Sequence, residues 1–256
     1  MTTAVRIDGV TKTFNLGKAN QIMALDGIDL TIESGEFVTL IGPSGCGKST
    51  LLRLVASLLS PSTGSIEVNG KPAEQARLDQ DYGMAFQRAG LFEWRDVARN
   101  IELPLELMGW SRSKRKERAA EMLELVKLDG FGGHHPAELS GGMQQRVAIA
   151  RALAFEPALL LMDEPFGALD EMTREHVQDE LLRIWGESGT TVVFVTHSVP
   201  EAVYLSTRVV VMSPRPGRIA TVIDVDLGGR DALTRDDPGF HEVVTEVRKA
   251  LRAVEA

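Results

Sequence analysis

Apolar and polar positions follow two different patterns in the first quarter of the chain. Residues 4–9 and 27–33 alternate apolar and polar side chains, which is typical of strands with one buried face. Residues 36–42 form a continuous apolar run instead, and a Gly-rich turn and a helix-like segment at 48–59 follow it. This part of the chain therefore predicts two half-buried strands and then a strand–loop–helix unit.

Strands and helices alternate along most of the remaining chain. Residues 157–165 are largely apolar, as in a strand that is covered on both faces of a parallel sheet. The other expected strands are 64–70, 81–87, 190–197, 208–213 and 218–225, and the expected helices are 170–186, 199–206 and 238–254. This alternation predicts an α/β fold with a mainly parallel sheet.

Residues 88–154 differ from both flanks because helical spacing dominates there. The apolar residues of 111–128 fall on one helical stripe, and a second helix is expected from about 142 to 155. We therefore expect residues 1–256 to form a single domain. Its expected parts are a catalytic α/β core with a β subdomain (1–87 and 155–230), a helical subdomain (88–154) and a C-terminal helical tail (231–256).

The composition narrows the class of protein. A net charge of −8 argues against a nucleic-acid-binding surface, so we interpret the basic run at 111–118 as a solvated helix face. Cys46 is the only cysteine, which excludes an internal disulfide and fits a reducing compartment. Residues 1–14 lack the apolar core of a signal peptide, and no run approaches the ~18–20 apolar residues of a membrane helix. Any membrane role therefore needs a separate spanning partner.

The Gly-rich turn has the pattern of a phosphate-binding loop. GPSGCGKST fits G-x-x-x-x-G-K-[ST] between a predicted strand and a predicted helix, a context that disfavours an accidental Gly-rich turn. Its backbone N–H groups should surround phosphate oxygens, while Lys48 reaches the β- and γ-phosphates and Ser49 ligates Mg²⁺. Cys46 is expected to contribute its backbone and no catalysis. The predicted ATP-binding residues of the loop are Gly42, Pro43, Ser44, Gly45, Cys46, Gly47, Lys48, Ser49 and Thr50.

The apolar strand expected within 157–165 ends in two carboxylates. Asp163 and Glu164 should lie at the carboxyl edge of the parallel sheet, where ligands of such folds bind. Asp163 can hold Mg²⁺, and Glu164 can polarise a water for attack on the γ-phosphate. Taken alone, an Asp-Glu pair here could be a helix-capping turn; together with the phosphate loop it predicts nucleotide hydrolysis.

With four further motifs, residues 5–215 resemble the ATP-binding cassette (ABC) ATPases. LSGGMQQ (139–145) looks like the signature of that family, Gln87 like its Q-loop glutamine, GALD (167–170) like its D-loop and His197 like its switch histidine. The resemblance implies a P-loop NTPase core with an N-terminal antiparallel β subdomain and an inserted helical subdomain. A P-loop kinase is disfavoured, since it has no use for the signature.

The resemblance also implies a head-to-tail dimer of two copies around two ATP molecules. Each signature would hold the ATP bound by the phosphate loop of the other copy, at a helix N-terminus suited to phosphate. A simple N-cap by Ser140 is compatible with this but leaves the paired glycines unexplained. The signature residues concerned are Leu139, Ser140, Gly141, Gly142 and Gln144.

Further site residues follow from the resemblance alone. Phe14 would stack on adenine, with plain core packing as the alternative. Gln87 would contact Mg²⁺ or the attacking water. His197 would bond the γ-phosphate and steady Glu164, with a buried structural histidine as the alternative. Asp170 would couple the two sites, although Gly167 replaces the serine common in this loop. The implied catalytic set is Lys48, Gln87, Glu164 and His197, and the implied Mg²⁺ set is Ser49, Gln87 and Asp163.

A flank after Gln87 is the expected contact with a membrane permease. Leu91, Phe92 and Trp94 stand in a polar stretch; by resemblance they line a groove for a permease helix, and otherwise they pack the helical insert. The chain as a whole resembles ATPases of nitrate, sulfonate and taurine importers, whose relatives take vitamin precursors. Such systems add permease subunits and an extracytoplasmic binding protein, which implies a peripheral position on the cytoplasmic face of the inner or plasma membrane.

Two other classes of ABC protein remain open at this point. One is the ATPase of an exporter or lipid-transport complex. The other is a soluble ABC ATPase of translation or DNA repair, which usually has two cassettes or a long coiled coil. The sequence predicts one cassette and no coiled coil, which disfavours the soluble class.

Overall fold

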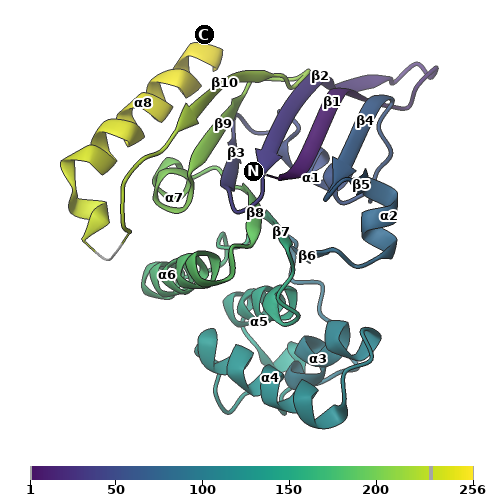
Figure 1. The fold of residues 1–256 in the computed structure, drawn as a ribbon, viewed down its shortest axis with the longest axis vertical. Helices are drawn as coiled ribbons and strands as arrows, with labels where there is room; N and C mark the ends of the chain where they lie inside the picture. Colours follow the sequence, from purple (N-terminus) through teal and green to yellow (C-terminus); the bar gives the residue numbers. More distant parts are fainter. Residues whose placement is uncertain (1, 231–232, 256) are drawn as a thin grey trace.

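The computed structural model describes residues 2–230 and 233–255 and contains two β-sheets (Figure 1). The larger sheet has the strand order β10-β9-β3-β8-β7-β6, and its neighbours are parallel except for the antiparallel pair of β9 and β10. Its strands are β3 (Phe37–Ile41), β6 (Tyr82–Ala85), β7 (Leu159–Asp163), β8 (Thr191–Val195), β9 (Arg208–Met212) and β10 (Ile219–Asp224). The predicted α/β fold with a mainly parallel sheet is confirmed.

The central strands of this sheet are buried on both faces. Every residue of β3, β7 and β8 is buried, because helices or the second sheet cover each side. Continuous apolar runs at these three positions were the signal for such strands, and the structure confirms it.

The second sheet is antiparallel and has the order β2-β1-β4-β5. Its strands are β1 (Thr3–Phe14), β2 (Ile22–Glu33), β4 (Thr63–Val68) and β5 (Lys71–Pro72). One core cluster joins its inner face to helix α1 (Lys48–Val55) and to one face of the larger sheet. This is the antiparallel β subdomain that the resemblance implied, and β1 and β2 confirm the two alternating segments.

Three helices form the end of the molecule opposite the antiparallel sheet (Figure 1). They are α3 (Val97–Leu107), α4 (Arg112–Leu125) and α5 (Gly141–Leu153), and a 3₁₀ turn η1 (Pro136–Glu138) precedes α5. A second core cluster unites these helices with the other face of the larger sheet. Both helices predicted in this region are confirmed, with α4 starting one residue after Ser111, its N-cap.

The remaining helices lie around both sheets, the first of them against β4 and β5. They are α2 (Ala73–Leu78), α6 (Glu171–Ser188), α7 (Val199–Leu205), the 3₁₀ turn η2 (Thr234–Asp236) and α8 (Pro238–Glu255). The predicted helices at 170–186, 199–206 and 238–254 are confirmed, whereas α2 and β5 were not predicted. No helix in the described ranges has the length and apolar character needed to cross a membrane.

The helix after the phosphate loop is shorter than the predicted span of 48–59. α1 ends at Val55 because Ser57 adopts a left-handed backbone conformation, with φ of 48°. The Ser57 N–H then donates to Leu54 O at 2.9 Å, and the Leu58 N–H donates to Arg53 O at 2.9 Å. These two bonds form a Schellman motif, which usually has glycine at the left-handed position; because serine stands there instead, the helix end was not predicted.

Candidate active site

The phosphate loop connects β3 to α1 in a tightly packed turn. A Cβ on Gly42 would lie 2.8 Å from Met212 O, and one on Gly47, where φ is 105°, would lie 2.6 Å from Leu25 Cδ2. These positions therefore require glycine. Lys48 is 6% exposed, and its ammonium donates to Gly42 O at 2.7 Å and to Pro43 O at 3.1 Å. The loop thus curls around the lysine.

A cavity of about 430 Å³ opens beside this loop. It gathers residues from β1, β2, the phosphate loop, α1, the segment after β6, the end of β7 and the loop between β9 and β10. The lining residues are Phe14, Ile22, Ala24, Ser44, Gly45, Gly47, Lys48, Ser49, Thr50, Gln87, Glu164 and Arg215. Most of the predicted ATP-site residues therefore meet in one cavity. Cys46 is buried behind the loop, 3.7 Å from Lys48 Nζ through its sulfur.

Asp163 and Ser49 form a pair of oxygen ligands beside Lys48. The Ser49 hydroxyl donates to Asp163 Oδ1 at 2.7 Å, although the two residues are 114 positions apart. Burial raises the pKa of the Asp163 carboxyl, and the bond from Ser49 only partly opposes this. Among the described residues, none forms a hydrogen bond with the buried Asp163 Oδ2, and Arg53 lies 3.8 Å away. A buried carboxylate oxygen without a hydrogen bond, beside a hydroxyl, fits the oxygen ligands that Mg²⁺ requires.

Two of the other predicted catalytic side chains, those of Gln87 and His197, converge on Glu164. Its Oε2 accepts a hydrogen bond from Gln87 Nε2 at 3.3 Å and lies 3.3 Å from His197 Nδ1. Glu164 adopts a left-handed conformation, with φ of 47°, and its N–H donates to Val195 O at the end of β8. The His197 side chain is 71% exposed, so the alternative of a buried structural histidine is wrong.

The signature motif begins α5 and lies outside this cavity. Ser140 is the N-cap of α5 and accepts from the Met143 N–H at 3.3 Å. Ser140 and Gly141 are exposed, Leu139 is buried, and the Gln144 amide braces the preceding turn by donating to Pro136 O and Leu139 O. Within the described part of the chain, no signature residue lines the cavity at the phosphate loop.

The D-loop packs directly against the signature helix. A Cβ on Gly142 would lie 2.9 Å from Ala168 O, so the second glycine of the signature is required for this contact. Asp170 is exposed and is the N-cap of α6, accepting from the Thr173 N–H at 3.0 Å. This hydrogen bond holds the pKa of the Asp170 carboxyl below its usual range.

The three residues predicted to contact a permease occupy different surroundings. Phe92 lines an apolar groove of about 430 Å³ between β6 and α3, together with Pro104 and Leu107. Leu91 packs against the core instead, and Trp94 is 73% exposed on a neighbouring hollow, with its ring centroid 4.8 Å from that of Phe92. Of the three, only Phe92 lines the groove.

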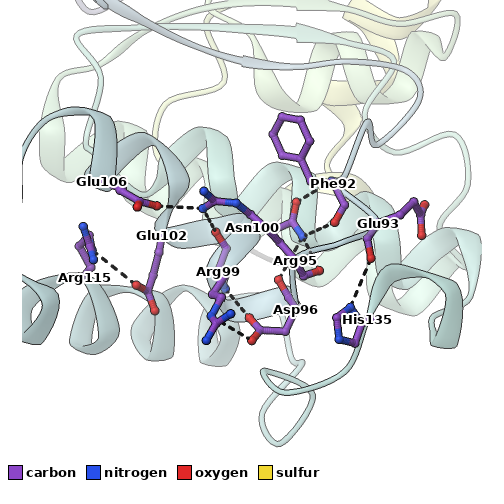
Figure 2. A network of polar contacts seen from close by, with 10 residues as sticks. All are labelled: Phe92, Glu93, Arg95, Asp96, Arg99, Asn100, Glu102, Glu106, Arg115 and His135. Atoms are coloured by element: carbon purple, nitrogen blue, oxygen red, sulfur yellow. Dashed lines mark hydrogen bonds and ion pairs between the residues drawn. The ribbon is translucent and has the colours of Figure 1, made fainter.

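Buried Asn100 fixes the turn that presents Phe92, a role that the sequence analysis missed. Its side chain accepts from the Phe92 N–H at 2.8 Å and donates to Phe92 O, Arg95 O and Asp96 O (Figure 2). An asparagine within an amphipathic helix gives no signal that it satisfies a distant turn.

Two residues of α5 tie the signature helix to the segment around Gln87. Gln145 Nε2 donates to Phe86 O at 2.9 Å, and the Arg151 guanidinium donates to Gly90 O at 3.0 Å and to Ala89 O at 2.9 Å. Arg151 was not among the predicted site residues; its place as a basic residue in a helix with mostly buried positions was the available signal.

Comparisons with known proteins agree with this geometry. A family model described as ABC transporter matches residues 25–167. A taurine import ATP-binding protein of Rhizobium johnstonii is 45% identical, covering 98% of this chain and 97% of that protein. An aliphatic sulfonates import ATP-binding protein of Bacillus cereus is 48% identical, covering 87% of this chain and 86% of the relative.

Solved structures of an ATP-binding cassette have the same fold. A dimeric post-hydrolysis state bound to ADP and Pi matches with a TM-score of 0.80 at 36% identity, over 87% of this chain and 99% of that one. A second dimeric structure of that same solved cassette matches with the same TM-score of 0.80 and the same identity of 36%. The resemblance inferred from the motifs is confirmed: the chain belongs to the ABC transporter family, as an ATP-binding and ATP-hydrolysing cassette.

Proposed function

We propose that this cassette powers the import of small solutes of the taurine and sulfonate type, working as a homodimer on a membrane permease. The observation that supports this most is the convergence of Gln87 and His197 on Glu164, which lines one cavity together with Lys48 and Ser49. Such a site hydrolyses ATP, and the relatives above are named for taurine and sulfonate import. These names favour import over export, translation or repair.

In this proposal the phosphate loop and Phe14 bind ATP. Loop N–H groups and Lys48 hold the phosphates, and the Phe14 ring at the cavity wall stacks on adenine. Ser49 and Asp163 hold Mg²⁺, with Gln87 as a further ligand. When bound, Mg²⁺ neutralises charge that develops on the phosphates.

Hydrolysis then needs a base directed at the γ-phosphate. The Glu164 carboxylate accepts a proton from a water as the water oxygen attacks the γ-phosphorus, and the bond to the bridging oxygen breaks to release ADP. Gln87 Nε2 and His197 Nδ1 both contact Oε2 of the Glu164 carboxylate, at 3.3 Å each. Donation from the other ring nitrogen of His197 to the γ-phosphate, with the Nδ1–H also directed at Glu164, would require the doubly protonated imidazolium.

A second copy would complete the site. The exposed N-terminus of α5 offers Ser140 and Gly141 to a phosphate, yet it lies outside the cavity of its own chain. A head-to-tail dimer would bring Leu139, Ser140, Gly141, Gly142 and Gln144 of one copy to the ATP of the other, and Asp170 would lie at the junction. The dimeric structures of the similar cassette support this arrangement.

The apolar groove at Phe92 is the proposed seat of a short permease helix. Apolar side chains of α3 and β6 line it, as an amphipathic helix requires, and the Trp94 ring lies against Phe92 from the neighbouring hollow. The cassette would then be peripheral, at the cytoplasmic face of the inner or plasma membrane. An extracytoplasmic substrate-binding protein would act through the permease.

Purification of the tagged protein from its native membranes in mild detergent tests this proposal. We expect a multi-spanning permease to co-purify, and its loss from a Phe92→Glu variant but not from an Arg248→Glu variant on α8. ATPase activity of the reconstituted complex should rise with a binding protein loaded with a sulfonate. Recovery of only ribosomal or DNA-repair factors would refute the importer.

A further inference from the structure

We propose that Arg215 is a further nucleotide-binding residue, whose guanidinium supplies a second fixed positive charge to the phosphates of bound ATP. This inference rests on the proposed function, since it extends the same nucleotide site. Arg215 lies in the loop between β9 and β10, 165 positions or more beyond the phosphate loop, and no recognised motif includes it.

Arg215 lines the nucleotide cavity with its side chain free. It borders the same space as Phe14, Ser44 and Lys48, and it is exposed. No described residue forms a hydrogen bond, an ion pair or a ring contact with its side chain, whereas the neighbouring Arg218 is paired with Asp26. The guanidinium has several N–H donors in a planar fork that matches phosphate oxygens, so its donors are available to a nucleotide.

Backbone hydrogen bonds hold the loop that carries Arg215 against β2. The Gly217 N–H donates to Ala24 O at 2.8 Å, and the Asp26 N–H donates to Gly217 O at 3.0 Å. At the base of the loop, the Arg218 N–H donates to the Ser213 hydroxyl at 3.1 Å. Arg215 therefore projects from a braced loop, which limits the entropy lost when its side chain binds a ligand.

The same loop lies directly on the phosphate loop. A Cβ at Gly217 would lie 1.9 Å from Cys46 O and 3.2 Å from Leu25 Cδ2, so only glycine permits this approach. Because Gly217 contacts the phosphate loop, the backbone at Arg215, two residues earlier, is held next to that loop as well as next to the sheet.

The charge of the cavity shows what Arg215 would add. Lys48, Glu164 and Arg215 are the charged residues among its lining residues. The Lys48 ammonium already donates to two loop carbonyls, and Glu164 carries the opposite charge. Without Arg215 the charges of Lys48 and Glu164 cancel, and the lining has no net charge. The chain as a whole has a net charge of −8, which repels an anionic ligand. Arg215 gives the lining a net positive charge, which favours an anionic ligand.

The test compares nucleotide affinities of Arg215→Gln, Arg215→Lys and a matched control, Arg248→Gln, which removes the same charge from the exposed face of α8. Calorimetry on each monomer would use ATP, ADP and adenosine at low and high salt. We expect Arg215→Gln to weaken ATP binding about tenfold, the range for one lost charged hydrogen bond, and Arg215→Lys to lose about threefold or less. The loss should shrink from ATP to ADP, vanish for adenosine and diminish in high salt.

Three results would overturn the assignment. They are ATP affinity of Arg215→Gln within about twofold of wild type, an equal loss for adenosine, and an equal loss in Arg248→Gln. An equal loss for adenosine would mean that Arg215 packs on the base and not on the phosphates. If the wild-type chain itself bound no nucleotide, the proposed function would fall together with this inference, whereas wild-type binding with an unaffected Arg215→Gln variant would remove only the inference.

Discussion

Arg151 connects three parts of the cassette, and its removal should have a measurable cost. It lies on α5, the signature helix, and donates to Ala89 O and Gly90 O just after the Q-loop glutamine Gln87. It also lines the apolar groove proposed for the permease. Burial lowers the pKa of its guanidinium, which indicates that water replaces its partners poorly.

The Arg151→Met variant removes both bonds while keeping an apolar stem of similar length. A hydrogen bond from a charged donor contributes about 1.5–3 kcal/mol; because the side chain is only half-buried, we expect its two bonds together to contribute about as much as one such bond. The expected loss of unfolding free energy is about 2–3 kcal/mol. Because residues 89 and 90 are then released, Gln87 should also hold Glu164 less firmly, and ATPase activity should fall while ATP affinity is unchanged.

Urea unfolding followed by circular dichroism measures the first effect, and phosphate release measures the second. Arg248→Met on the exposed face of α8 is the matched control, with an expected change below about 0.5 kcal/mol. If Arg151→Met unfolded within about 0.5 kcal/mol of wild type and kept its ATPase activity, the two bonds would not link the helix to the Q-loop as reasoned.

Three further variants test other parts of the site. Glu164→Gln should retain ATP binding, lose about 10²–10⁴-fold in turnover and elute as an ATP-bound dimer in gel filtration; rapid hydrolysis would exclude the general-base role. Ser140→Arg should abolish hydrolysis with monomer ATP affinity intact, since Ser140 serves the partner's nucleotide, and surviving turnover would disprove the shared site. Burial raises the pKa of the Glu201 carboxyl, which accepts a 2.6 Å bond from Thr196 Oγ1. The folded state therefore keeps this proton to higher pH than the unfolded state, and this contribution to stability is lost as pH rises from the unfolded pKa through the folded one. Glu201→Gln should match wild type near pH 4 and become the more stable of the two towards pH 7 in thermal melts; parallel pH profiles would contradict this.

Local chemistry made much of the fold predictable. Strands β3, β7 and β8 consist of apolar runs because both of their faces are covered, so the sequence predicts them as strands. The loop GPSGCGKST was predictable because its glycines are needed for backbone turns and close contacts. The ends of elements were less predictable. α1 ends in a Schellman motif with Ser57 at the left-handed position. Because glycine usually occupies this position, the serine did not indicate a helix end.

The sequence by itself was enough to predict the phosphate loop, the two carboxylates at the end of β7 and the helix N-terminus at Ser140. Each of these features depends only on residues that are adjacent in the chain. Only the tertiary structure decided which of these groups meet. Asp163 reaches Ser49 across 114 positions, and Glu164 reaches Gln87 across 77. Tertiary packing likewise exposed His197, separated Trp94 from the groove at Phe92 and brought Arg215 to the nucleotide cavity. Contacts of this kind arise from the order of strands in the sheet and the packing of loops at its edge, which no local pattern of side chains encodes.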